Sequence, residues 1–167
     1  GRVYIICLLH PHTFPSLQEF MRRFHSAKEA LTQVFGFADF RPHQEEIIEA
    51  VIEGRDALVL MPTGGGKSLC YQIPALVREG TAVIVSPLIA LMQDQITAIQ
   101  NRGLEAACLS SANSLEENRE IESQFLSGTL DFLYVTPERL VNEWTISMLQ
   151  RARVSLFAVD EAHCVSQ

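Results

Sequence analysis

Short apolar runs alternate along this chain with stretches of helical hydrophobic periodicity. The runs occupy residues 57–61 (ALVLM), 81–86 (TAVIVS), 106–110, 131–136 (DFLYVT) and 154–160 (VSLFAVD). Most are apolar throughout, which is typical of strands that are buried on both faces. Because a helical stretch separates each run from the next, the strands connect by crossovers rather than hairpins. The sequence therefore predicts an α/β fold in which a parallel sheet carries helices on both faces.

Capping residues and glycines mark the expected ends of these helices. Ser26 with Glu29 and Ser114 with Glu117 have the spacing of a capping box at a helix start. Pro42 suits the first turn of a further helix. Glycine readily adopts the left-handed backbone conformation that ends a helix, and a glycine follows each of five helical stretches, at Gly36, Gly54, Gly80, Gly103 and Gly128. The remaining helices are expected over 67–79, 88–102 and 138–151.

Composition limits the class of protein. The 167 residues include 47% hydrophobic and 20% charged residues, as expected for one globular domain. A net charge of −7 excludes a wholly basic nucleic-acid clamp but allows a local basic groove. The four cysteines (Cys7, Cys70, Cys108 and Cys164) form no C-x-x-C pair, which favours reduced thiols over a zinc site or disulfides.

The N-terminal residues allow two interpretations. Residues 3–9 (VYIICLL) resemble a short signal sequence, but no A-x-A cleavage pattern follows, so we expect a protein that is not secreted. No apolar run is long enough to span a membrane. Met21 directly precedes the first well-formed helix. Residues 1–25 are therefore interpreted as an extension outside the domain at 26–167, either non-native sequence or an edge strand packed on it.

A glycine-rich loop at residues 61–68 (MPTGGGKS), termed the phosphate loop, separates an expected strand from an expected helix. Glycines allow successive backbone N–H groups to point at one anion, and the helix N-terminus adds its positive dipole. The candidate phosphate-binding residues are Thr63, Gly64, Gly65, Gly66, Lys67 and Ser68. The Lys67 ammonium can reach the β- and γ-phosphates, and the Ser68 hydroxyl can ligate Mg²⁺. The general pattern has glycine where this chain has Met61.

Acidic residues follow the last strand, in the sequence Asp160-Glu161-Ala162-His163. Asp160 can hold Mg²⁺ through its water shell, and Glu161 can orient and deprotonate an attacking water. A capped helix start would have the same composition. The phosphate loop roughly ninety residues upstream favours the catalytic interpretation.

Five segments of this chain closely resemble the RecQ family of superfamily 2 DNA helicases. They are residues 35–44, 61–72, 85–95, 136–140 and 160–167. The resemblance extends over 26–167, and methionine is the usual family residue at the position of Met61. It implies a RecA-like P-loop NTPase fold, the first helicase lobe, with ATP and Mg²⁺ as cofactors. It further implies an ATP-dependent helicase that moves 3′ to 5′ on DNA in repair and recombination.

The same resemblance assigns roles around the nucleotide. Gln44 would pair with the adenine edge, since an amide offers one donor and one acceptor. Arg41 would lie against the base, with Phe37 in the same pocket. Lys67, Asp160, Glu161 and His163 form the implied catalytic set. His163 is similar to the residue that couples the nucleotide and DNA sites, although it could instead make a helix-start hydrogen bond.

Two further pairs, Ser86-Pro87 and Thr136-Pro137, end expected strands and begin expected helices. Exposed N–H groups at such turns can hold DNA phosphates without reading bases. Ordinary helix capping is the alternative explanation. Similarity to the DNA-contacting motifs favours binding of single-stranded or forked DNA.

The sequence ends at Gln167, just after Asp160-Glu161-Ala162-His163. The family has a second lobe, which supplies an arginine finger, and a further strand beside the phosphate-loop strand. We therefore expect this chain to bind Mg–ATP but not to unwind DNA alone, with an apolar sheet edge exposed. The alternatives are a non-enzymatic nucleotide- or nucleic-acid-binding remnant and another superfamily 2 translocase. The expected location is the cytoplasm, including the bacterial nucleoid, or the nucleus of a eukaryote.

Overall fold

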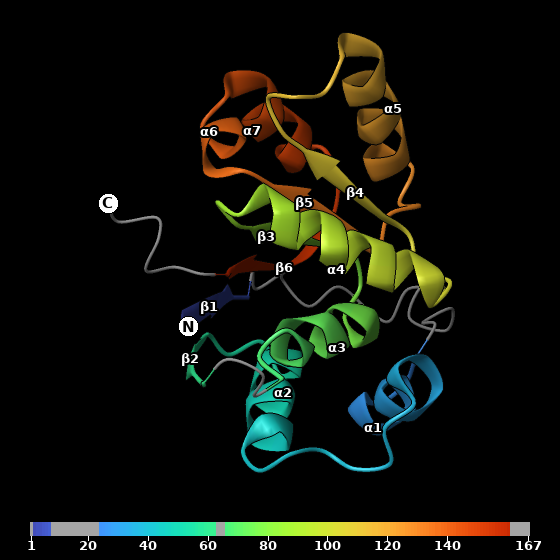
Figure 1. The fold of residues 1–167 in the computed structure, drawn as a ribbon, viewed down its shortest axis with the longest axis vertical. Helices are drawn as coiled ribbons and strands as arrows, with labels where there is room; N and C mark the ends of the chain where they lie inside the picture. Colours follow the sequence, from blue (N-terminus) through green and yellow to red (C-terminus); the bar gives the residue numbers. More distant parts are fainter. Residues whose placement is uncertain (1, 8–23, 63–65, 161–167) are drawn as a thin grey trace.

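A six-stranded sheet forms the centre of the molecule, in the order β2-β1-β6-β3-β5-β4 (Figure 1). The computed structural model describes residues 2–7, 24–62 and 66–160. The strands are β1 (Arg2–Ile6), β2 (Ala57–Leu60), β3 (Thr81–Val85), β4 (Ala106–Leu109), β5 (Phe132–Val135) and β6 (Val154–Val159). Strands β4, β5, β3 and β6 pair in parallel, which confirms the predicted class of α/β fold.

Strand β1 is the exception, because it is antiparallel to both of its neighbours. Ile5 lies opposite Ala57 of β2 on one side and Ala158 of β6 on the other. Val3 and Ile5 are buried, whereas Tyr4 and Ile6 are about half exposed, so the strand has one core face. Residues 2–6 therefore form an inner strand, and not the edge strand that one interpretation of the N-terminus expected.

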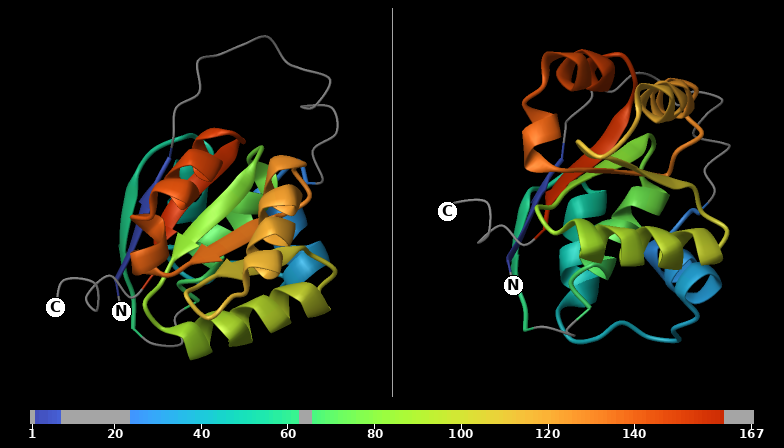
Figure 2. Two further views of the ribbon diagram at one scale, coloured as in Figure 1. Left: turned by 90° about the horizontal axis from the view of Figure 1, so that it is seen from above. Right: turned by 45° about the horizontal axis from the view of Figure 1, so that its top comes forward.

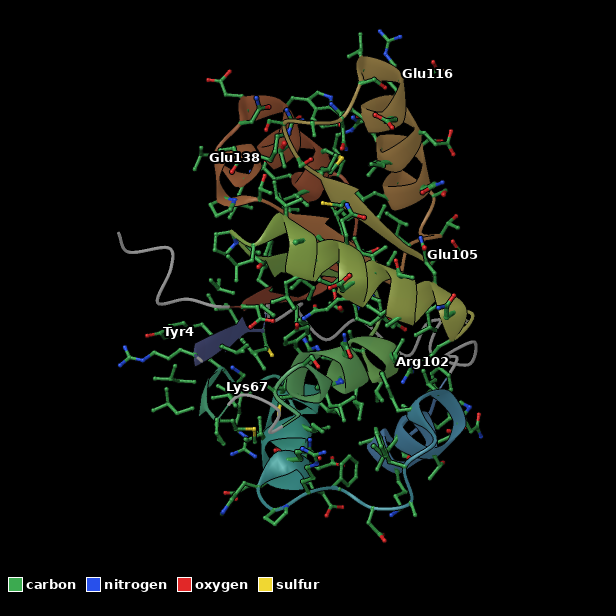
Figure 3. The ribbon with its side chains drawn as sticks, viewed as in Figure 1. Tyr4, Lys67, Arg102, Glu105, Glu116 and Glu138 are labelled. Atoms are coloured by element: carbon green, nitrogen blue, oxygen red, sulfur yellow. The ribbon has the colours of Figure 1, made fainter. Side chains whose placement is uncertain are left out.

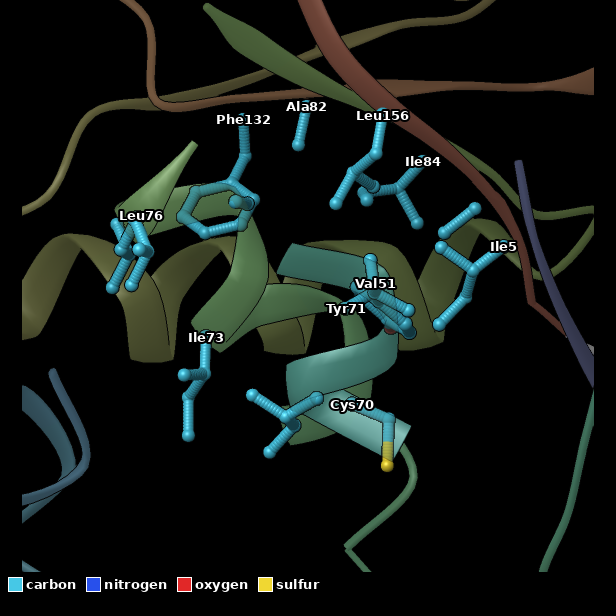
Figure 4. Close-up of a cluster of buried hydrophobic side chains, with 14 of the residues drawn as sticks. Ile5, Val51, Cys70, Tyr71, Ile73, Leu76, Ala82, Ile84, Phe132 and Leu156 are labelled. Carbon is cyan, nitrogen blue, oxygen red and sulfur yellow. The ribbon is translucent and has the colours of Figure 1, made fainter. Parts of the chain in front are cut away.

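Helices cover both faces of the sheet, as predicted (Figure 2). One side carries α1 (Ala27–Ala30), its π-helical continuation η2 (Leu31–Phe35), α2 (Gln44–Ile52), α3 (Leu69–Val77) and α4 (Ile89–Asn101). The other side carries α5 (Leu115–Leu126), α6 (Pro137–Leu140) and α7 (Glu143–Gln150). Successive residues of β3 divide between the two cores: Ala82 and Ile84 pack with the first group, Val83 with the second. Figure 4 shows the first core, where side chains of α3 meet the sheet.

Strand β2 departs from the prediction of burial on both faces. Leu58 and Leu60 are 53% and 64% exposed, and only Val59 is buried. The reason is the position of the strand. β2 lies at the edge of the sheet, and α2 packs against it on the core side, where Val59 is buried. The apolar run at 57–61 thus borders solvent on one side.

Two helix boundaries also differ from expectation. The single helix expected over 138–151 is two helices, because the Asn142 side chain accepts hydrogen bonds from the N–H groups of Trp144 and Thr145 and starts α7. Pro42 lies before α2 rather than in its first turn, and His43 precedes the helix with a φ of 70°. The capping box of Ser114 and Glu117 is confirmed in both of its hydrogen bonds.

No helix within 2–7, 24–62 or 66–160 combines the length and apolarity needed to cross a membrane.

Candidate functional site

A cavity of about 560 Å³ opens beside the carboxyl end of β6. Its walls come from η2, the loop before α2, the start of α3 and one face of α4. Seven of the residues predicted for the nucleotide site line this one cavity: Phe37, Arg41, Gln44, Gly66, Lys67, Ser68 and Asp160. Pockets for cofactors commonly measure roughly 300–1,000 Å³, so the cavity has a suitable size for a nucleotide.

The described end of the phosphate loop leads directly into α3. Gly66 has a φ of 81°, a conformation that glycine adopts at little cost. Lys67 and Ser68 form a turn, and their carbonyl groups accept hydrogen bonds from the N–H groups of Cys70 and Gln72. Figure 3 shows Lys67 at the N-terminal end of α3. Thr63, Gly64 and Gly65 lie outside the described residues.

The Ser68 hydroxyl makes no capping hydrogen bond to α3. Hydroxyl and carboxylate oxygens suit Mg²⁺, and Ser68 and Asp160 border the same cavity. Across the described ranges, no group of three or more His, Cys, Asp or Glu side chains could hold a metal. Because Mg²⁺ is usually bound through one or two protein oxygens together with phosphate oxygens and water, Ser68 and Asp160 fit a magnesium ion that enters with phosphate.

Gln44 is buried to 1% exposure and links two parts of the cavity wall. Its Nε2 donates to the Gly66 carbonyl oxygen at 3.2 Å, and its Oε1 accepts from the Arg41 backbone N–H at 2.8 Å. The amide retains a second N–H and a second lone pair, which is the pair of functions that an adenine edge requires. Phe37 and Arg41 are both exposed at the cavity, where a base can reach them.

Asp160 is held at the end of β6 by backbone and side-chain contacts. Its N–H donates to the Val85 carbonyl oxygen at 2.9 Å, and its Oδ2 accepts from the Tyr71 hydroxyl at 2.7 Å. Tyr71 also contacts Gln95 Oε1 at 3.2 Å. Burial, together with the nearby Tyr134 and Asp160, raises the pKa of Tyr71 well above its usual value, so its hydroxyl remains a donor. Glu161 and His163 lie outside the described residues.

Sequence reasoning did not include Tyr71 or Gln95 in the site. The sequence did contain a signal for Tyr71, because the segment 69–77 (LCYQIPALV) is almost entirely apolar and therefore predicts a buried helix, in which a tyrosine hydroxyl usually has a partner. For Gln95, a residue on the cavity face of α4, no local pattern distinguishes the side chain from a solvated glutamine. The sequence also contains no indication that Arg102 lies over the Phe35 ring, 5.4 Å from its centroid, where both residues line the cavity.

The residues predicted to contact DNA lie at neighbouring strand ends outside this cavity. Ser86 and Thr136 are buried, and their N–H groups donate to the carbonyl oxygens of Val135 and Leu109 within the sheet. Pro87 and Pro137 have no N–H group. The expected exposed N–H groups are therefore not those of these four residues, and the DNA assignment of the two turns stays a prediction.

Comparison with known proteins decides the family. Residues 41–167 match the DEAD/DEAH box helicase family. This chain belongs to that family. It is 46% identical over 142 residues to the ATP-dependent DNA helicase RecQ of Haemophilus influenzae, which is 85% of this chain and 23% of that protein.

Other relatives give the same result. The RecQ helicase of Bacillus subtilis is 46% identical over 144 residues, which cover 86% of this chain and 24% of that protein. The ATP-dependent helicase SGS1 of Saccharomyces cerevisiae is 40% identical over 163 residues, which cover 92% of this chain and 11% of that protein. The resemblance to RecQ helicases is thereby confirmed, and the chain spans less than a quarter of the length of these relatives.

Proposed function

We propose that this chain is a nucleotide-binding lobe of a DNA helicase, in which Mg–ATP hydrolysis drives 3′ to 5′ unwinding during repair and recombination. The observation that carries the proposal is the cavity. Residues from the loop before α2, the phosphate loop and the end of β6 meet there, although they are distant in sequence.

Each residue has a defined task in this proposal. The Lys67 ammonium binds the β- and γ-phosphates, and the Gln44 amide binds the adenine edge. Ser68 and Asp160 hold magnesium, which when bound neutralises charge that develops on the phosphate oxygens. Glu161 accepts the proton of the attacking water, and His163 links the nucleotide site to DNA.

Hydrolysis and unwinding are proposed for a longer protein like the relatives, and Mg–ATP binding for the 167 residues. Single-stranded or forked DNA is the proposed substrate, contacted at the Ser86-Pro87 and Thr136-Pro137 turns. A second helicase lobe supplies the arginine finger. The proposed location is the cytoplasm and bacterial nucleoid, or the nucleus in a eukaryote.

Titration with a fluorescent ATP analogue in Mg²⁺ tests the proposal. We expect saturable binding by the natural sequence and at least roughly tenfold weaker binding by Lys67→Ala, because a charge-assisted contact to phosphate is lost. Arg119→Ala is the matched control, since it removes one exposed cation from α5 on the opposite face of the sheet. Equal affinity in all three proteins, or no saturable binding in any, would overturn the proposal.

A further inference from the structure

Tyr71 connects three elements that border the nucleotide cavity. It lies on α3, and its hydroxyl contacts Asp160 at the end of β6 and Gln95 on α4. The Tyr71 side chain is completely buried and Asp160 is 5% exposed. A contact in such a place is protected from competing water, so it can fix the geometry of the groups that it joins.

The hydroxyl has one proton and two possible acceptors. It lies 2.7 Å from Asp160 Oδ2 and 3.2 Å from Gln95 Oε1. The shorter distance places the proton toward the carboxylate, which is also the stronger acceptor. Rotation of the Gln95 amide by a half turn brings Nε2 to the position of Oε1, and this group can donate to the Tyr71 oxygen. Donation then runs in one direction, from Gln95 to Tyr71 to Asp160.

We propose that Tyr71 is a positioning residue, which fixes the rotation of the Asp160 carboxylate for the magnesium ion that accompanies the nucleotide. Gln95 fixes the Tyr71 hydroxyl in turn. This inference rests on the proposed Mg–ATP function. Its physical basis is that a ligating carboxylate without a hydrogen-bonded partner samples several rotations, and such outer partners commonly account for roughly 10- to 100-fold in metal affinity.

The test is Tyr71→Phe, which keeps the buried ring and removes only the hydroxyl. Binding of the fluorescent ATP analogue is measured across Mg²⁺ concentrations and in EDTA. We expect the Mg²⁺ concentration for half-maximal tight binding to rise about tenfold, while the affinity in EDTA is unchanged. A role limited to packing would change neither quantity, or would change both together.

Tyr134→Phe is the matched control. Tyr134 is a buried tyrosine of the same core that lies near Asp160, but in the described part of the chain no hydrogen bond joins its hydroxyl to that carboxylate. Its loss should leave the Mg²⁺ dependence unchanged. Gln95→Leu should raise the required Mg²⁺ concentration in the same direction as Tyr71→Phe, but less. If Tyr71→Phe does not fold, an unshifted Mg²⁺ dependence in Gln95→Leu overturns the positioning role instead.

The outcomes separate this inference from the proposed function. Mg²⁺-dependent binding by the natural sequence with an unshifted Tyr71→Phe overturns the role of Tyr71 alone. Absence of Mg²⁺-dependent binding in the natural sequence overturns the proposed function and this role with it. A double-mutant cycle of Tyr71→Phe and Asp160→Ala on unfolding then still reports, without nucleotide, whether the hydrogen bond exists.

Discussion

Gln44 Nε2 donates a hydrogen bond to the carbonyl oxygen of Gly66, 3.2 Å away, and so joins the first turn of α2 to the end of the phosphate loop. Only glycine suits position 66 in this arrangement. Its φ of 81° is strained for other residues, and a Cβ there would overlap Gln44 Nε2. The contact joins the parts of the cavity that are proposed to bind adenine and phosphate.

Gly66→Ala should therefore lower both stability and nucleotide affinity. We expect a loss of about 1–2 kcal/mol in the free energy of unfolding from the left-handed backbone alone. The Gln44 side chain can move, so Gly66→Ala combined with Gln44→Ala should cost less than the sum of the two single changes. Urea denaturation of the three variants measures this, and strict additivity would contradict the contact.

Gln44→Ala should reduce the preference for adenine. We expect the ratio of ATP to GTP affinity to fall by about tenfold, because a paired amide contributes about 1–3 kcal/mol of base discrimination. Competition of each nucleotide against the fluorescent analogue measures the ratio. Arg119→Ala, on α5, should leave it unchanged, and an unaltered ratio in Gln44→Ala would place the adenine elsewhere.

Ile5 and Ile6 test the place of β1 in the sheet. Ile5 is 1% exposed and Ile6 is 46% exposed, although they are adjacent. Ile5→Ala should lower the free energy of unfolding by about 2–5 kcal/mol, the usual cost for a buried isoleucine, and Ile6→Ala by less than about 1 kcal/mol. Similar small effects in urea denaturation would show that residues 2–6 do not pack on the domain.

Gly80 and Gly103 differ in their surroundings. Both have positive φ values, 105° for Gly80 and 78° for Gly103. A Cβ added to Gly80 would lie 2.6 Å from the Arg153 carbonyl oxygen, whereas a Cβ added to Gly103 would have no atom within 4 Å. Backbone atoms cannot move aside as a flexible side chain can. Gly103→Ala should cost about 1–2 kcal/mol, and Gly80→Ala about 1–3 kcal/mol more, in chemical denaturation. Equal costs would mean that the backbone yields at Arg153.

The Cys70 thiol should make the fold sensitive to alkaline pH. Burial raises its pKa to about 12 from an ordinary value of 9.0. The unfolded chain therefore releases this proton first, so the stabilising contribution is complete below about pH 9 and is lost as pH rises toward 12. Between pH 8 and pH 10, the free energy of unfolding should fall less in Cys70→Ala than in the natural sequence. The difference between the two slopes should be at most about 1.4 kcal/mol per pH unit. Equal pH dependence would mean that solvent reaches the thiol.

Local patterns predicted most elements because their causes lie within a few residues. The Ser114 side chain caps α5 through a residue three positions away, and glycines at 54, 103 and 128 follow the C-caps of α2, α4 and α5 with the positive φ that ends a helix. The split between α6 and α7 had such a signal too, since Asn142 is a common type of N-cap residue. That boundary was predictable and was missed.

Contacts between segments that are distant in the sequence could not be predicted from local patterns. Tyr71 and Asp160 are 89 positions apart, and nothing in the sequence near either residue indicates the other. The exposure of Leu58 and Leu60 depends on β2 being at an edge, and strand order is a property of the whole sheet.

The sequence by itself determined the α/β class, the phosphate loop, the strand-end carboxylate and the family, because each depends on residue types at short, fixed spacing. Only the tertiary structure decided that β1 enters antiparallel between β2 and β6, and that Gln44 and Tyr71 each join distant segments at the cavity. Strand insertion and buried hydrogen bonds depend on which surfaces remain uncovered after the helices pack. That outcome arises from the whole chain at once, and no single segment encodes it.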